Sequence, residues 1–123
     1  DPRGDVDIPA ADIVGCGIAV NGNEVSIDVI LDAPLAADIQ YRLVLPQTNT
    51  QIKYADGSVT GPNKIKPTAT AVGDRQIRYT FDGARLGWDG ISPFQFQFET
   101  QDGVSGGAGQ GFIDTTTVKT YLP

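Results

Sequence analysis

Apolar and polar side chains alternate along most of this chain, and this alternation limits what it can fold into. In the segment Glu24–Leu31, one face would carry Val25, Ile27, Val29 and Leu31, and the other face would carry Glu24, Ser26 and Asp28. Successive side chains of a strand point to opposite faces of its sheet, so a period of two is typical of a strand with one buried face. The segments with this period are Glu24–Leu31, Ile39–Leu45, Gln76–Phe81 and Phe94–Glu99.

Turn signals separate these segments. Asn21-Gly22 is a strong hairpin signal, and Asp-Gly pairs occur at Asp56, Asp82, Asp89 and Asp102. The pattern predicts an all-β, antiparallel, jelly-roll-like β-sandwich of eight or nine strands in one domain over residues 1–123. Residues 33–38 form one helical turn at most, and the glycine-rich residues 103–111 are predicted to be a loop. The strands are expected near 13–20, 24–31, 39–45, 51–54, 66–72, 75–81, 94–99, 111–114 and 116–121.

Composition excludes several classes of function. Fifteen acidic and nine basic residues give a net charge of −6 with no basic cluster, which argues against binding nucleic acid or an anionic membrane. No apolar run approaches the length of a membrane span. The chain has no His and no Met, which removes the commonest general base and makes zinc, copper and haem sites poor candidates.

Nothing in the sequence favours an enzyme. Without His, Ser–His and Cys–His nucleophiles are ruled out. Cys16 lies inside an apolar strand, so we expect a buried, inert thiol. Asp28, Asp32 and Asp38 are close in sequence, but Asp28 is predicted to face solvent and the other two bracket a turn that contains a proline, so paired-carboxylate chemistry is not expected.

The amino-terminal segment is unusually acidic. Asp1, Asp5, Asp7 and Asp12 fall within twelve residues, opposed only by Arg3. Proline and glycine stiffen and turn this loop, which lowers the entropy cost of gathering carboxylates around a cation. Ca²⁺ takes six to eight oxygen ligands, so we predict a calcium site in a secreted, extracellular module. The alternative is a solvated acidic terminus without an ion. The predicted ligands are Asp1, Asp5, Asp12 and, from the far end of the chain, Asp114.

The opening DPRGDVDIPAADI, the Tyr41-x-Leu segment and the later F-x-F-x-F-E-T resemble a known group. This is the DOMON-like and family-9-like carbohydrate-binding β-sandwich group, found as accessory domains of secreted bacterial proteins. The resemblance implies a structural calcium site at the opening D-x-x-G-D and D-I. Sugar-binding members stack paired exposed tryptophans on the ligand, whereas this chain has only Trp88.

Trp88 lies in the loop GARLGWDGISP between two strands. Its ring could stack on a pyranose while Arg85 and Asp89 bind hydroxyl groups, or it could plug one end of the sandwich. We predict a non-catalytic accessory module that binds polysaccharide or another cell-surface glycan. The alternative is a structural subunit of a surface fibre or layer. It would self-associate through edge strands, with the β-branched run Thr115–Leu122 either closing its own sheet or pairing with a neighbour.

Overall fold

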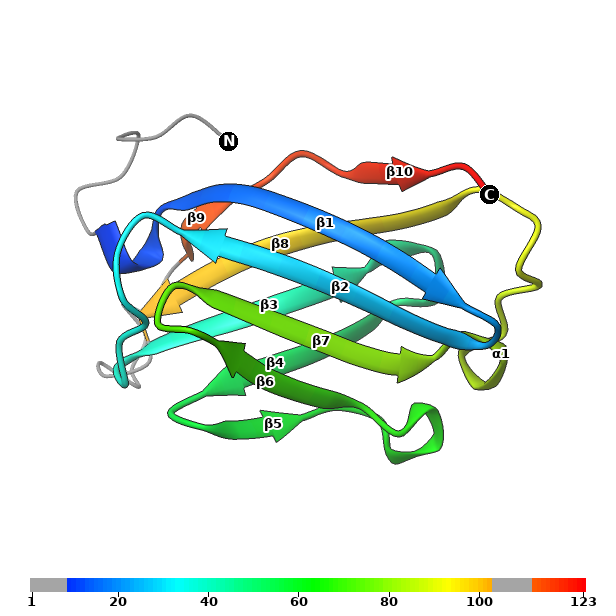
Figure 1. The fold of residues 1–123 in the computed structure, drawn as a ribbon, viewed down its shortest axis with the longest axis horizontal. Helices are drawn as coiled ribbons and strands as arrows, with labels where there is room; N and C mark the ends of the chain where they lie inside the picture. The colour runs from blue at the N-terminus through cyan, green and yellow to red at the C-terminus, as the bar shows by residue number, and fades with distance from the viewer. Residues whose placement is uncertain (1–8, 103–111) are drawn as a thin grey trace.

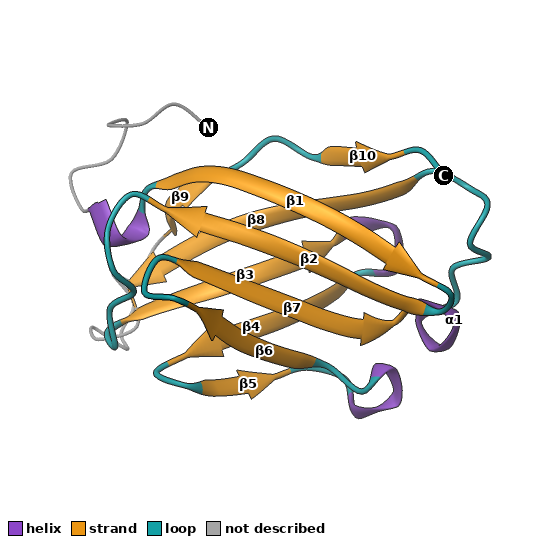
Figure 2. Ribbon diagram, viewed as in Figure 1, coloured by secondary structure: helices purple, strands orange, loops and turns teal. Residues whose placement is uncertain are grey.

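The computed structural model describes residues 9–102 and 112–123, and it forms two stacked antiparallel sheets (Figure 1). Strands make up most of this part of the chain, and the helical segments are single turns between them (Figure 2). The helical segments are η1 (Pro9–Ala11), η2 (Pro46–Thr48), η3 (Asn63–Ile65) and α1 (Gly83–Leu86). The strands are β1 (Ile13–Asn21), β2 (Glu24–Leu31), β3 (Ile39–Leu45), β4 (Thr50–Ala55), β5 (Ser58–Thr60), β6 (Thr68–Val72), β7 (Gln76–Asp82), β8 (Phe94–Asp102), β9 (Phe112–Thr115) and β10 (Lys119–Tyr121).

The predicted antiparallel sandwich is confirmed. One sheet has the order β1-β2-β7-β6 and the other β10-β8-β3-β4-β5, with β9 also paired to β8. This order matches the A-B-E-D and G-F-C-C′-C″ sheets of the immunoglobulin sandwich, a connectivity that strand periodicity alone does not distinguish from a jelly roll. The structure has ten strands in its described residues, one or two more than predicted. β5 was missed because all three of its side chains are exposed, so it has no alternation to detect.

The period of two is explained by the packing of the two sheets. On β2 the inward side chains Val25, Ile27, Val29 and Leu31 are all buried. They meet the inward side chains of the second sheet, which include the predicted core residues of β3 and β8. The core also holds Tyr41 and Tyr79, as expected from their phase with aliphatic neighbours.

The predicted burial of Cys16 is wrong, because its thiol is exposed. β1 is an edge strand, and among the residues that the structure describes it pairs only with β2. A bulge between Ile13 and Gly15 shifts its register, and beyond that point Ile18 and Val20 are only half-buried. β1 is rich in apolar residues, but it is an edge strand, so its composition did not indicate that Cys16 is buried.

The carboxyl-terminal run closes its own sheet. Lys119, Thr120 and Tyr121 of β10 pair with Phe96, Gln95 and Phe94 of β8. This outcome is the first of the two expected for Thr115–Leu122. Among the residues described, no helix is long and apolar enough to cross a membrane.

Two isoleucines on β2 test the inward and outward assignment. Ile27 is fully buried and Ile30 is 38% exposed. We expect Ile27→Ala to lower the free energy of unfolding by about 2–5 kcal/mol, because it leaves a cavity between the sheets. Ile30→Ala removes the same atoms from the outer face and should cost less than about 1 kcal/mol. Urea unfolding of both variants measures the difference, and equal losses would contradict the assignment.

Candidate functional site

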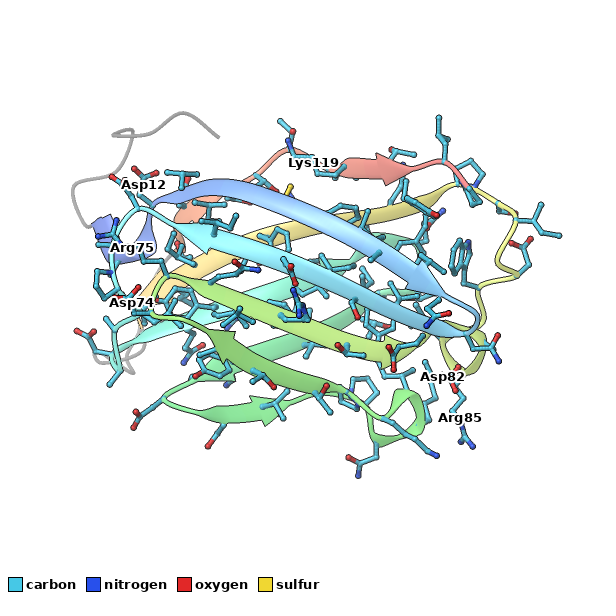
Figure 3. The ribbon with its side chains drawn as sticks, in the orientation of Figure 1. Asp12, Asp74, Arg75, Asp82, Arg85 and Lys119 are labelled. Atoms are coloured by element: carbon cyan, nitrogen blue, oxygen red, sulfur yellow. The ribbon has the colours of Figure 1, made fainter. Side chains whose placement is uncertain are left out.

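The candidate site residues lie at opposite ends of the sandwich. Figure 3 places Asp12 beside η1 at one end, and Asp82 and Arg85 at the other. The predicted calcium ligands that the structure describes belong to the first end. The predicted glycan-contacting residues belong to the second, because Arg85 lies in α1 and Trp88 and Asp89 follow shortly after its end at Leu86. The two groups are therefore separate sites.

At the acidic end, the structure brings two predicted ligands from far apart in the sequence to the same segment. Asp12 is fully buried, and Asp114, on β9, is 9% exposed. Asp114 Oδ2 accepts a hydrogen bond of 2.9 Å from the backbone N–H of Ile13, and its Oδ1 accepts one of 2.9 Å from Thr115 N. The carboxylate of Asp114 therefore ties β9 to the start of β1, next to Asp12.

Other hydrogen bonds fix the backbone of Asp12 and of the two residues before it. The hydroxyl of Tyr41 donates to Ala10 O at 2.8 Å, and that of Thr100 donates to Ala11 O at 2.8 Å. Asp12 O accepts from Asp32 N at 3.0 Å. Three successive carbonyl groups are therefore held by three different parts of the sandwich, which fixes where this segment runs.

These donors fit part of a calcium site. Asp1 and Asp5 lie outside the described residues, as do Asp7 and the predicted loop at 103–111. Within residues 9–102 and 112–123, no group of three or more acidic, His or Cys side chains could hold a metal. Asp12 and Asp114 offer hard oxygen donors, and each carboxylate oxygen of Asp114 has lone-pair capacity beyond its one backbone bond. Calcium needs six to eight oxygens, so any cage must take most of its ligands from elsewhere.

At the other end, Trp88 closes the sandwich. Its ring lies 5.0 Å from that of Phe94 and 6.3 Å from that of Tyr121, centroid to centroid, and its Nε1 donates to Ser92 O at 2.9 Å. Gly83 permits this packing, since a Cβ there would lie 3.2 Å from Trp88 Cε3. The indole remains half-buried, so it serves as the predicted plug and still forms part of the surface.

A hollow of about 260 Å³ opens beside this indole. Its walls come from η2 and the end of β3 on one side and from the α1–β8 connection on the other. Its lining includes the side chains of Gln47, Trp88, Asp89 and Gln95, together with the apolar Leu45 and Leu86. An aromatic ring beside amide and carboxylate groups is a suitable surface for a polar ligand with one apolar face.

Asp89 fixes the conformation of the loop that forms one wall of this hollow. Its Oδ1 accepts from Ile91 N at 2.8 Å and Ser92 N at 2.7 Å, and its Oδ2 accepts from Ser92 Oγ at 2.6 Å. These bonds, chiefly the Ser92 hydroxyl, lower the pKa of Asp89 to about 2. The carboxylate is therefore ionised at neutral pH and already engaged by its own loop.

Arg85 lies outside the hollow. Its side chain is exposed and pairs with Asp82, with Nε 3.6 Å from Oδ2 (Figure 3). Asp82 also caps α1, because its Oδ1 accepts from Arg85 N at 3.1 Å. Of the three predicted contact residues, the structure thus brings Trp88 and Asp89 together at the hollow and leaves Arg85 on the neighbouring surface.

Sequence reasoning missed Gln47 and Gln95. Gln47 Nε2 donates to Pro93 O at 3.1 Å, and its Oε1 accepts from Gln95 N at 3.0 Å, which joins η2 to the start of β8. The side-chain amide of Gln95 makes no hydrogen bond to any residue described. Only the adjacency of β3 and β8 in one sheet reveals that these loops meet, and the sequence carries no signal for that adjacency.

No family model, curated protein or solved structure matches this chain. The resemblance to carbohydrate-binding accessory domains therefore stays a prediction from the residues alone.

The bonds of Asp89 predict a pH response of Trp88, the only tryptophan in the chain. A carboxylate whose folded pKa is lowered stabilises its loop above its unfolded pKa of about 3.9, and this stabilisation is lost as the pH falls through about 2. We expect the indole emission to be constant from pH 7 to about 4 and to change below that. Asp89→Asn should remove most of this step. An unaltered step in the variant would contradict the role of Asp89.

Proposed function

We propose that this chain is a non-catalytic binding module of a secreted protein, with a glycan as the ligand of the Trp88 hollow and calcium at the opposite end. The observation that supports this most is the half-buried indole at the hollow, with amide and carboxylate groups on the same walls. A pyranose offers one apolar C–H face and a ring of hydroxyls, which such a surface complements. The volume of about 260 Å³ suits one or two sugar rings rather than a long chain.

Two polar groups would define the orientation of the sugar. The amide of Gln95 offers a donor and an acceptor, since no described residue binds it. Asp89 keeps acceptor capacity on its ionised carboxylate beyond the three bonds within its loop. Gln47 would not contact the sugar through free amide groups, because both ends of its amide already bind backbone groups. It would instead fix the position of Gln95.

A binding role is also favoured over catalysis by the chemistry of the chain. It has no His, and among the carboxylates considered for glycoside hydrolysis, Asp28 is engaged on the outer face of its sheet. Its Oδ1 accepts from Arg78 Nε at 2.9 Å and its Oδ2 from Gln76 Nε2 at 2.9 Å. A carboxylate held in this way is a poor general acid.

Calcium would bind where the amino-terminal segment meets the sandwich. Asp12 and Asp114 are the described donors, and Asp1 and Asp5 would supply further oxygens. The ion would fix this segment against β9, and it would also reduce the repulsion among the acidic groups. Calcium sites of extracellular modules bind at about 0.1–1 mM, and we expect an affinity in this range.

Glycan binding can be tested with the fluorescence of Trp88. We expect one class of neutral oligosaccharide on a glycan array to bind, and the same sugar to shift the indole emission with saturation. Gln95→Ala should weaken binding by about 1 kcal/mol, or roughly fivefold, through a lost hydrogen bond. Gln101→Ala, on the same strand outside the hollow, is the matched control. If no glycan class binds, or if both variants weaken binding equally, the assignment of the hollow fails.

Calcium binding can be tested by thermal unfolding. If calcium binds only the folded chain, stability should rise with its concentration, by about 2.7 kcal/mol at one hundred times the dissociation constant. Asp12→Asn should abolish this increment. Asp56→Asn, in the turn between β4 and β5, makes the same change of charge and should keep it, since Asn also tolerates the left-handed backbone there. An increment that survives Asp12→Asn would refute the site.

A further inference from the structure

The sandwich leaves its edges protected to different degrees. β5 and β10 have three residues each, and β10 carries Lys119. β6 has five residues and starts directly after Pro67. Short strands, lysine and proline are common devices that keep edge strands from pairing with other chains. β1 is the longest of these edge strands, with nine residues, and within the described part of the chain it pairs with β2 alone (Figure 1).

β1 has almost none of these devices. Its sequence IVGCGIAVN contains no charged residue and no proline. Its bulge lies at the start, between Ile13 and Gly15, and the pairing with β2 is regular from Gly15 to Asn21. Cys16, Gly17 and Ala19 are small and exposed, so none of these three residues blocks the approach of another backbone to this edge.

We propose that β1 pairs in antiparallel fashion with β1 of a second copy across a two-fold axis near Gly17, which joins two four-stranded sheets into one of eight strands. An antiparallel pair of identical strands is two-fold symmetric, so a single surface serves both copies. Each copy has a net charge of −6, and like-charged surfaces repel. A seam built from β1 brings together only uncharged side chains, which favours a second copy at this edge.

The neighbouring outer face is also compatible with a second copy. The register pairs Gly17 with Asp28 of β2, so this carboxylate is the charge nearest the axis, whereas Glu24 lies opposite Asn21 at the end of the strand. Asp28 is neutralised within its own sheet by Arg78, through bonds of 2.9 and 3.1 Å. A shallow hollow of about 400 Å³ over Gly17, Ala19 and Ser26 leaves room for side chains of the partner.

The position of Cys16 on β1 allows this dimer geometry to be tested by cross-linking. With the axis near Gly17, Cys16 lies opposite Ile18 of the second copy, so the two Cys16 residues are diagonal neighbours about 7–8 Å apart. Their exposed thiols are then within reach of a short bis-maleimide. A dimer formed through any other edge would hold the two thiols far apart.

Sedimentation at about 100 µM tests the proposal, since a complex with a micromolar dissociation constant is almost fully formed there. We expect a dimer that a short bis-maleimide links covalently, and a Cys16→Ser chain that still dimerises without being linked. Gly17→Lys should raise the dissociation constant at least about tenfold, because the two-fold axis sets two lysines against each other. A Cβ at Gly17 meets nothing within 4 Å, so the fold should tolerate the change.

Thr70→Lys, at an exposed position of β6, is the control with the same change of charge, and it should leave the dimer intact. Thermal unfolding verifies that each variant is folded, and Ala19→Lys replaces Gly17→Lys if the latter is not. A monomeric parent chain at 100 µM, a dimer that both β1 variants leave unchanged, or a dimer that Thr70→Lys weakens equally would each overturn the proposal. Dimer loss confined to the β1 variants, together with linkage through Cys16, would support it.

Discussion

Two buried tyrosine hydroxyl groups join the sheets to each other and to the amino-terminal end. Tyr79, on β7, donates across the core to the carbonyl of Tyr41 at 2.8 Å. Tyr41 Oη in turn donates to Ala10 O at 2.8 Å and accepts from Ala36 N at 3.0 Å. Burial raises the pKa of Tyr41, and that of Tyr79 further, so both stay protonated donors at neutral pH. An unpaired buried hydroxyl costs about 1–3 kcal/mol, so this chain of bonds strongly favours one placement of the acidic end.

That placement is what brings Asp12 and Asp114 to the same segment. Tyr41 holds residue 10, Thr100 holds residue 11, and Asp114 holds residue 13. Each donor or acceptor belongs to the second sheet, whereas β1 belongs to the first. The start of β1 therefore crosses the end of the sandwich and is bonded to both layers. A cation bound here would reinforce a junction that these hydrogen bonds already define.

Local patterns predicted the local structure, and they failed where the outcome depends on which strands are neighbours. Alternation located the long strands, because each buries one face. Asp114, chosen in the sequence as the distant acid for the acidic end, lies on β9 and bonds to Ile13 N, next to Asp12, whereas its role as a metal ligand stays a prediction. Cys16 was misplaced because an apolar strand at a rim and one at the centre of a sheet look alike in sequence. Gln47 and Gln95 were missed because only the β3–β8 pairing brings their loops together.

The two ends of the sandwich are held by different forces, so they can act independently. The Trp88 end depends on aromatic contacts with Phe94 and Tyr121 and on a carboxylate that stays ionised down to a pH of about 2. The acidic end depends on buried hydrogen bonds to the backbone of residues 10–13. No described hydrogen bond or ion pair joins the two groups of residues, and only the strands between them link the ends. If a cation binds at the acidic end, its removal should therefore leave the shape of the hollow at the other end intact.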